Sequence, residues 1–329
     1  MKAVKKVFRK SRILKSPAFG CLKDVPTINV TRGCLHRCAY CYARTFPETP
    51  SYGVELYENL PAKLQEELKG LRRRGRMPAV VTFSTASDLF QPHPEVLKIT
   101  YSCLKILLEE GVGVSFLTKG RLSKEFWELF SYYSESVRAR FGLVSFSLTY
   151  HRLFEPRTAN PYLRLRQMER ASLLGLKPAV RIDPVIPGIT DRPEEVFKLL
   201  RQVKTAGVEE VSVSYLVLRP GVIRQLQKEL PPKTFLSIMK AYQGMPWSRV
   251  ITSATTKLAR RDWREKGYRI FRQIAEELGL KIHICGCKNP DFPFENCSPW
   301  DLSSRKRKEW RPGILFETLP GQKKGGGRS

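Results

Sequence analysis

Short apolar runs alternate with amphipathic stretches along most of the chain. The apolar runs are typical of buried parallel strands, which predicts strands at 26–31, 79–84, 113–118, 143–149, 177–183 and 210–216. Between them apolar residues recur at helical spacing, which predicts helices such as 94–111, 163–175 and 193–207. Several of these helices end on a glycine, a residue that suits a helix C-terminus.

This alternation predicts an α/β fold with a parallel sheet, because consecutive strand–helix units need right-handed crossovers that leave helices on the sheet. About six units fit a partial or complete TIM-type (βα)6 barrel better than a small doubly wound sheet. Functional loops are then expected at the C-terminal ends of the strands. After residue 217 the pattern becomes irregular, before a helix expected at about 257–278 and a strand at 280–285.

Four segments are expected along the chain. A basic N-terminal segment at 1–25 precedes the barrel core at 26–220. A C-terminal helical extension follows at 221–300 and ends in a cysteine-containing loop. The last segment, 301–329, is basic and ends in GQKKGGGRS, which is typical of a partly flexible tail.

The chain is strongly basic, because 58 Lys and Arg against 31 Asp and Glu leave a formal net charge of +27. Such a surface attracts polyanions, so nucleic acid is the partner class that we expect first. The competing interpretation is a solvated basic surface or a weak attraction to anionic membrane. No stretch approaches the roughly 20 apolar residues of a membrane span, and the basic segment 1–15 has no continuous apolar part, so we expect a cytoplasmic protein that does not enter membranes.

Three of the eight cysteines stand close together, at Cys34, Cys38 and Cys41, immediately after the first predicted strand. This spacing lets a short loop place three thiolates on an iron–sulfur cluster and leaves one iron open to a chelating cosubstrate. A structural zinc site needs a fourth ligand, which His36 or a distant cysteine would have to supply. The spacing favours the cluster, with zinc as the alternative.

The sequence around these cysteines, RGCLHRCAYCYAR, resembles the fingerprint of the radical S-adenosylmethionine (SAM) superfamily. Together with FSTASDLFQPHPE (83–95), SFSLTYHRLFEPRTANPYLRLRQM (145–168) and VRIDPVIPGITD (180–191), it is similar to the spore photoproduct lyase-like, or DNA repair photolyase-like, branch. The resemblance implies a partial (βα)6 radical SAM barrel that binds a [4Fe–4S] cluster and SAM. One-electron reduction of the cluster would cleave SAM to methionine and a 5'-deoxyadenosyl radical, which abstracts hydrogen from a substrate.

The resemblance also implies SAM-binding residues at the ends of the barrel strands. Tyr40 would lie beside the adenine, and polar groups from Ser84 to Asp88 would meet the methionine amino group. Others would contact the ribose, carboxylate or adenine. The full set of cofactor-binding candidates is Tyr40, Ser84, Ser87, Asp88, Lys119, Ser147, Thr149, Arg181, Asp183 and Gly188. The competing interpretations are local backbone hydrogen bonds for the hydroxyls, a helix N-terminal charge for Asp88 and an exposed turn for Lys119.

One departure from this resemblance concerns the substrate. Spore photoproduct lyase uses a cysteine a few tens of residues beyond its cluster to return a hydrogen atom to the thymine product, and the matching region here, VTFSTASDLF, has none. The nearest thiol, Cys103, is a catalytic candidate, although cysteine in a helical pattern most often behaves as a small buried hydrophobe. Repair of the spore dimer is therefore not expected.

A second group of cysteines, Cys285, Cys287 and Cys297, follows a predicted strand in a loop rich in Gly, Pro and Asn. They are candidates for an auxiliary iron–sulfur cluster, for a catalytic radical or hydrogen relay, or for a structural zinc knot with His283. Three unrelated cysteines are the plain alternative. Cys21 is expected to be structural.

We therefore expect a radical SAM enzyme that acts on a nucleic-acid base or sugar, in DNA repair or in DNA or RNA modification. Trp300 and Trp310 flank the basic run RKRK, where they would either stack bases or anchor the tail. A low-potential electron donor such as flavodoxin or ferredoxin would be a second partner. Two alternatives stay open: radical chemistry on a peptide or small molecule, and a zinc-stapled nucleic-acid-binding protein without redox chemistry.

Overall fold

The structure is a computed structural model that describes residues 4–17, 20–250, 254–293 and 295. At its centre lies a seven-stranded sheet with the order β12-β9-β8-β7-β6-β5-β2, in which every neighbouring pair is parallel. The strands are β2 (Thr27–Ile28), β5 (Val80–Phe83), β6 (Gly113–Thr118), β7 (Val137–Gly142), β8 (Ala179–Val185), β9 (Glu210–Tyr215) and β12 (Lys281–Ile284). The predicted α/β fold with a parallel, partial-barrel sheet is confirmed.

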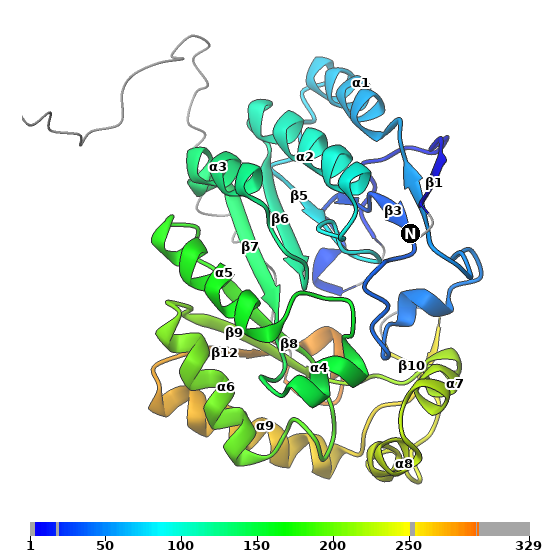
Figure 1. The fold of residues 1–329 in the computed structure, drawn as a ribbon, viewed down its shortest axis with the longest axis vertical. Coiled ribbons are helices and arrows are strands. Elements are labelled where there is room, and N and C mark those ends of the chain that lie inside the picture. Colours follow the sequence, from blue (N-terminus) through cyan, green and yellow to red (C-terminus); the bar gives the residue numbers. More distant parts are fainter. Residues whose placement is uncertain (1–3, 18–19, 251–253, 294, 296–329) are drawn as a thin grey trace, which may run out of the picture.

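The described helices are α1 (Leu60–Arg73), α2 (Pro94–Glu109), α3 (Lys124–Tyr132), α4 (Leu148–Phe154), α5 (Pro161–Leu173), α6 (Pro193–Thr205), α7 (Pro220–Glu229), α8 (Pro232–Lys240) and α9 (Arg261–Glu277). Helices such as α2, α5, α6 and α9 cover one face of the large sheet, whereas α7 and α8 lie away from it (Figure 1). Buried residues such as Leu104 of α2 and Leu199 of α6 join the strand residues in one hydrophobic core. Within the described residues, none of the helices has both the length and the apolar character needed to cross a bilayer.

The two faces of the sheet differ because successive side chains of a strand point to opposite faces. The paired residues Val180 and Val211 are apolar and buried in the core, against the helices. The next pair along the same two strands, Arg181 and Ser212, is polar. We call the side that carries this second pair the inner face. Its polar positions lead to the C-terminal ends of the strands, where the cysteine loop lies.

Two small sheets and four short 3-10 helices complete the described structure. One sheet has the order β1-β4-β3, and the other is the antiparallel pair β10–β11. Their strands are β1 (Val4–Val7), β3 (Thr31–Arg32), β4 (Val54–Tyr57), β10 (Ser248–Arg249) and β11 (Thr255–Thr256). The 3-10 helices are η1 (Gly20–Leu22), η2 (Tyr42–Thr45), η3 (Ser134–Ser136) and η4 (Gly286–Lys288). The sheet containing β1 and β4 pairs the N-terminal segment with the strand that follows the cysteine loop.

The fourth strand of the barrel lies earlier than the sequence pattern predicts. β7 covers Val137–Gly142, whereas the prediction was 143–149. The error has a physical cause: Arg138 and Arg140 interrupt the apolar run, because alternate positions of this strand belong to the polar inner face. The predicted segment instead leads into α4, whose N-cap Ser147 accepts a hydrogen bond from the Tyr150 N–H.

Two further boundaries also differ from the prediction. The expected strand 26–31 is divided between β2, in the large sheet, and β3, in a small sheet. The helix expected from about 257 begins at Arg261, and the strand expected after it is β12. β12 pairs in parallel with β9, so the seventh strand comes from the range expected for the C-terminal extension.

Candidate functional site

The loop between β3 and β4 places Cys34, Cys38 and Cys41 at the C-terminal edge of the large sheet, and all three are half-buried. Its course is fixed by backbone hydrogen bonds, including one of 3.1 Å from the Cys41 N–H to the Cys38 carbonyl. Another, of 2.9 Å, runs from the Ala39 N–H to the carbonyl of Phe154 in α4. The loop is thus anchored both to itself and to the barrel.

The surroundings of Cys34 and Cys38 disfavour the thiolate form of these two side chains. Burial raises the pKa of Cys34 to about 12, with a further contribution from the Asp88 carboxylate. Burial and the Glu155 carboxylate likewise raise the pKa of Cys38. A metal cation bound to the sulfur reverses this preference, because a coordinating thiol loses its proton outright. Cys34 and Cys38 are therefore poor nucleophiles as free thiols, whereas a bound metal cation would favour their thiolates.

The donors of the cysteine loop are the three thiols Cys34, Cys38 and Cys41. Within the part of the chain that the structure describes, no group of three or more His, Cys, Asp or Glu side chains is placed to hold one metal ion. A zinc ion needs all of its ligands within about 2.0–2.3 Å of one point. An iron–sulfur cluster is bound through separate iron atoms, so its cysteines need not converge in this way. Three thiols in one loop are the type of donor that binds iron–sulfur clusters.

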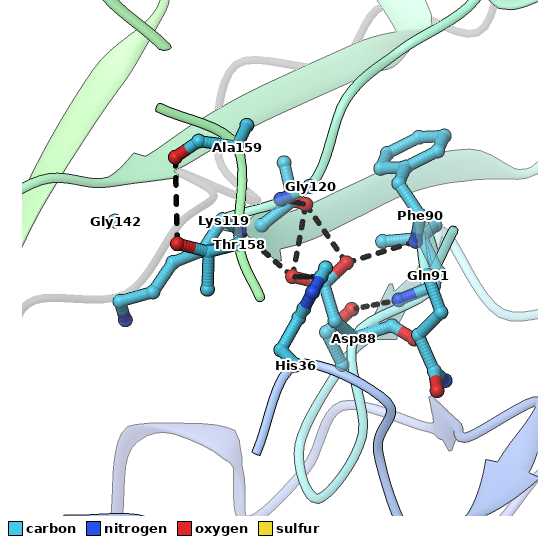
Figure 2. Close-up of polar contacts among 12 residues, drawn as sticks. His36, Asp88, Phe90, Gln91, Lys119, Gly120, Gly142, Thr158 and Ala159 are labelled. Atoms are coloured by element: carbon cyan, nitrogen blue, oxygen red, sulfur yellow. Dashed lines mark hydrogen bonds and ion pairs between the residues drawn. The ribbon is translucent and has the colours of Figure 1, made fainter. Parts of the chain in front are cut away.

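Asp88 braces the cysteine loop against the ends of β5 and β6. Its carboxylate accepts hydrogen bonds from Thr118 Oγ1 at 2.8 Å, from the Lys119 N–H at 2.7 Å and from the Phe90 N–H at 2.8 Å. His36 Nε2, from the cysteine loop, lies 3.4 Å from the same carboxylate (Figure 2). Burial raises the pKa of Asp88, but His36 and the backbone donors outweigh burial and hold it below its usual value. Asp88 therefore stays ionised as the centre of this brace.

A second brace behind the loop contains two residues that the sequence did not mark. Tyr40 donates a hydrogen bond to Glu155, which also forms a 2.6 Å ion pair with Arg164. Both Glu155 and Arg164 are fully buried. Burial raises the pKa of Glu155, but Arg164, Lys119 and Tyr40 together hold it below its usual value. Tyr40 is thereby fixed, and the Lys119 ammonium lies 5.7 Å from its ring centroid.

Asp183, at the end of β8, is enclosed by cations. Lys288 Nζ lies 2.6 Å from its carboxylate, and Arg181 Nε donates to it at 2.8 Å. Burial raises the pKa of Asp183, but Lys288 and Arg181 outweigh burial and lower it strongly. Arg181 also contacts Cys285 Sγ at 3.7 Å. The candidates Arg181 and Asp183 thus lie together on the inner face, and Lys288 is a third member that sequence reasoning missed.

The segment after β5 is held by a side chain from the end of β2. Asn29 Oδ1 accepts hydrogen bonds from the Ala86 N–H at 2.8 Å and the Ser87 N–H at 3.1 Å. Ser84 has a φ of 70°, a left-handed conformation that is unusual for serine, and its Oγ accepts from the Leu89 N–H. The Ser87 hydroxyl is buried and has no hydrogen-bond partner among the described residues. The Ser87 hydroxyl is therefore the polar group of this segment that remains available to bind a ligand.

The remaining cofactor candidates lie on other loops of the same edge. Ser147 and Thr149 are exposed and belong to the N-cap and first turn of α4, so their expected place at the end of a strand is wrong. The Gly188 N–H donates to Asp191 Oδ1 at 2.7 Å, and Asp191 Oδ2 accepts from Trp263 Nε1 at 2.8 Å. Asp191 and Trp263 thus order the loop after β8, a role that the sequence did not reveal.

The later cysteines are only partly grouped. Cys285 is buried, and Cys287 accepts a 3.1 Å hydrogen bond from the backbone N–H of Cys21, which the fold brings from the other end of the chain. Cys297 lies outside the described residues. Cys103 is buried within α2, and burial alone raises its pKa. The structure therefore places Cys103 away from the loop edge, among the apolar residues of the core.

Comparison with known proteins gives both distant and closer relatives. An uncharacterized protein of Mycobacterium tuberculosis is 30% identical over 226 residues, a match that covers 65% of this chain and 65% of the relative. The chain thus spans less than two thirds of that relative's length. A protein of Pseudomonas phage M6 named radical SAM Nalpha-GlyT isomerase is 22% identical over 267 residues, covering 77% of this chain and 51% of the phage protein.

Among solved structures, a variant of spore photoproduct lyase superposes with a TM-score of 0.63 at 18% identity, covering 85% of this chain and 82% of the lyase. This likeness concerns the fold. The model of the radical SAM superfamily matches residues 28–200, a range that includes the cysteine loop and the sheet from β2 to β8. By the matched range, more than half of its length, the chain belongs to the radical SAM superfamily.

Proposed function

We propose that Cys34, Cys38 and Cys41 hold the [4Fe–4S] cluster that membership of the superfamily implies, and that SAM binds beside it at the C-terminal edge of the sheet. The observation that carries this proposal is the position of the three thiols in one anchored loop at that edge. When bound, the cluster and SAM supply reductive cleavage and hydrogen abstraction. A low-potential donor such as flavodoxin or ferredoxin would deliver the electron.

The protein's own residues shape and charge this edge. Tyr40, fixed by Glu155, presents its ring beside Lys119. The Lys119 ammonium and the unused Ser87 hydroxyl are the groups that we assign to the charged and polar parts of SAM. Asp88 orders the turn that carries Lys119, so we assign it a positioning role.

We infer that the substrate is a base or sugar of nucleic acid. The net charge of +27 supports this, since it favours binding to phosphates. One similar protein agrees with it: a solved spore photoproduct lyase is complexed with a dinucleoside spore photoproduct. Because the region VTFSTASDLF contains no cysteine, we do not propose repair of the spore dimer.

Cluster binding and SAM cleavage are tested on protein purified without oxygen. Iron and sulfide are counted, and 5'-deoxyadenosine is assayed after incubation with SAM and dithionite. We expect product from the wild type and none from Cys34→Ala, Cys38→Ala or Cys41→Ala. Cys103→Ala is the matched control, because it removes a buried thiol that packs in the core within α2, and it should retain activity. Zinc-loaded protein that forms no 5'-deoxyadenosine would refute the proposal.

The substrate class is tested in the same assay. Single-stranded DNA and RNA oligonucleotides should stimulate formation of 5'-deoxyadenosine, since a base must leave the stack to reach a radical site inside a barrel. Stimulation by peptides alone would indicate that the substrate is a peptide.

We propose that Cys285, Cys287 and Cys297 bind an auxiliary iron–sulfur cluster. An iron content above four atoms per chain would support this role. Loss of the additional iron in Cys285→Ala would identify Cys285 as a ligand.

A further inference from the structure

The loop that carries the three cysteines is covered by α7, a helix far away in the sequence. α7 packs on η2, the turn that follows Cys41, and a Cβ added at Gly221 would lie 2.7 Å from Thr45 Cβ. Helix and turn are therefore too close for any side chain at that position. At the start of α7, the Arg219 guanidinium lies 4.8 Å from the ring centroid of Tyr42, which adds a cation–π contact.

Gln225 of α7 binds the cysteine loop directly. Its Nε2 donates to the carbonyl of Ala39 at 2.6 Å and to the carbonyl of Cys41 at 3.3 Å. These carbonyls belong to an irregular loop, where side chains or water must satisfy the backbone groups. One amide group thus fixes two peptide units of the loop, one before Tyr40 and one after Cys41.

A charged pair fixes the other half of the loop. Arg44 Nη1 donates to the carbonyl of Cys38 at 3.0 Å and to that of Arg37 at 3.3 Å. The same guanidinium forms a two-pronged ion pair with Glu229 at the end of α7. Gln225 and Glu229 are four residues apart and so lie on one face of the helix. α7 therefore presents two adjacent polar side chains to the segment that runs from Arg37 to Cys41.

We propose that Gln225 and the Arg44–Glu229 pair are positioning residues for the iron–sulfur cluster, a role that rests on the proposed function of the three cysteines. By holding four carbonyls of the loop, they fix where the thiols point without touching sulfur. Glu229 also balances the positive charge of Arg44. A positive charge stabilises the reduced, more negative cluster, so loss of Glu229 should raise its midpoint potential.

The test uses the full chain, reconstituted without oxygen, and compares Gln225→Ala and Glu229→Gln with Gln227→Ala. Gln227 is the matched control, because it is exposed and, two residues from Gln225, lies on another face of the same helix. In the first two variants a ferrous chelator should remove iron about 10-fold faster than from the wild type, the scale seen when groups that support metal ligands are lost. Glu229→Gln should in addition shift the midpoint potential upward, a change that general destabilisation does not produce.

A second measurement needs no cluster. In the iron-free protein, amide hydrogen exchange over residues 33–46 should be faster in Gln225→Ala than in the wild type and unchanged in Gln227→Ala. Unaltered exchange, or iron release equal in all three variants, would overturn the positioning role. A wild type that binds no iron would refute the proposed function instead, while the exchange result would still show whether α7 holds the loop.

Discussion

Single residues around the cysteine loop depend on partners that are distant in the sequence. Glu155 is the clearest case, because Tyr40 lies 115 residues before it and Arg164 lies on the next helix. The sequence predicted Tyr40 from the motif around the cysteines. It gave no sign of Glu155 or Lys288, since a buried ion pair leaves no local pattern and only the fold brings its members together.

The buried pair of Glu155 and Arg164 gives a prediction about stability. Arg164→Met should lower the free energy of unfolding by about 3–5 kcal/mol, because it leaves a buried carboxylate without its cation. Adding Glu155→Gln should recover much of this loss, since no charge is then left behind. Denaturant unfolding of the iron-free protein measures both. Equal losses in the single and double variants would contradict the assigned cause.

Asp183 gives a prediction about pH. Its pKa is lower in the folded protein than in the unfolded chain, so its contribution to stability is complete above about pH 4 and is lost as the pH falls below that value. The free energy of unfolding should therefore fall less between pH 5 and pH 3 in Asp183→Asn than in the wild type. Urea titrations at both pH values test this, and parallel losses in the two proteins would contradict it.

At the scale of elements, apolar periodicity located most of the sheet but failed where arginines interrupt a strand. Strands β5, β6 and β9 lie close to their predicted ranges, because no lysine or arginine interrupts their sequences. β7 was misplaced because Arg138 and Arg140 interrupt its apolar run, although Arg140 is itself buried in the fold. Gln225 was missed as well, since 186 residues separate it from Ala39.

Two glycines should respond in opposite ways to substitution by alanine. Gly120 lies where the connection after β6 packs directly on the connection after β5. A Cβ at Gly120 would lie 2.2 Å from the Phe90 carbonyl oxygen, so Gly120→Ala should destabilise the protein by about 3 kcal/mol. Gly70 lies inside α1 near the flexible end of Arg74, so Gly70→Ala should stabilise it by about 0.5–1 kcal/mol. Thermal or urea unfolding compares the two. Effects of the same sign would refute the packing argument.

For the whole molecule, the excess of positive charge makes a prediction about binding. If phosphates are the partner, the logarithm of oligonucleotide affinity should fall linearly with the logarithm of salt concentration, with a slope of about −0.7 per contact on single strands. Fluorescence anisotropy at several salt concentrations measures it. Deletion of 305–329, which removes the RKRKEWR cluster, should make the slope shallower. An affinity that does not change with salt concentration would show that the positive charge does not contribute to oligonucleotide binding.

The strand order also determines when the fold can be completed as the chain is synthesised. β12 closes one edge of the sheet beside β9, and α7 covers a loop that leaves the ribosome nearly 200 residues earlier. Contacts this far apart in sequence slow folding, and domains form as units while the chain grows. The nascent chain therefore lacks the helix that covers the cysteine loop until α7 has been made. If the three cysteines hold a cluster, as we propose, its insertion should follow synthesis of the C-terminal third, when the barrel is nearly finished.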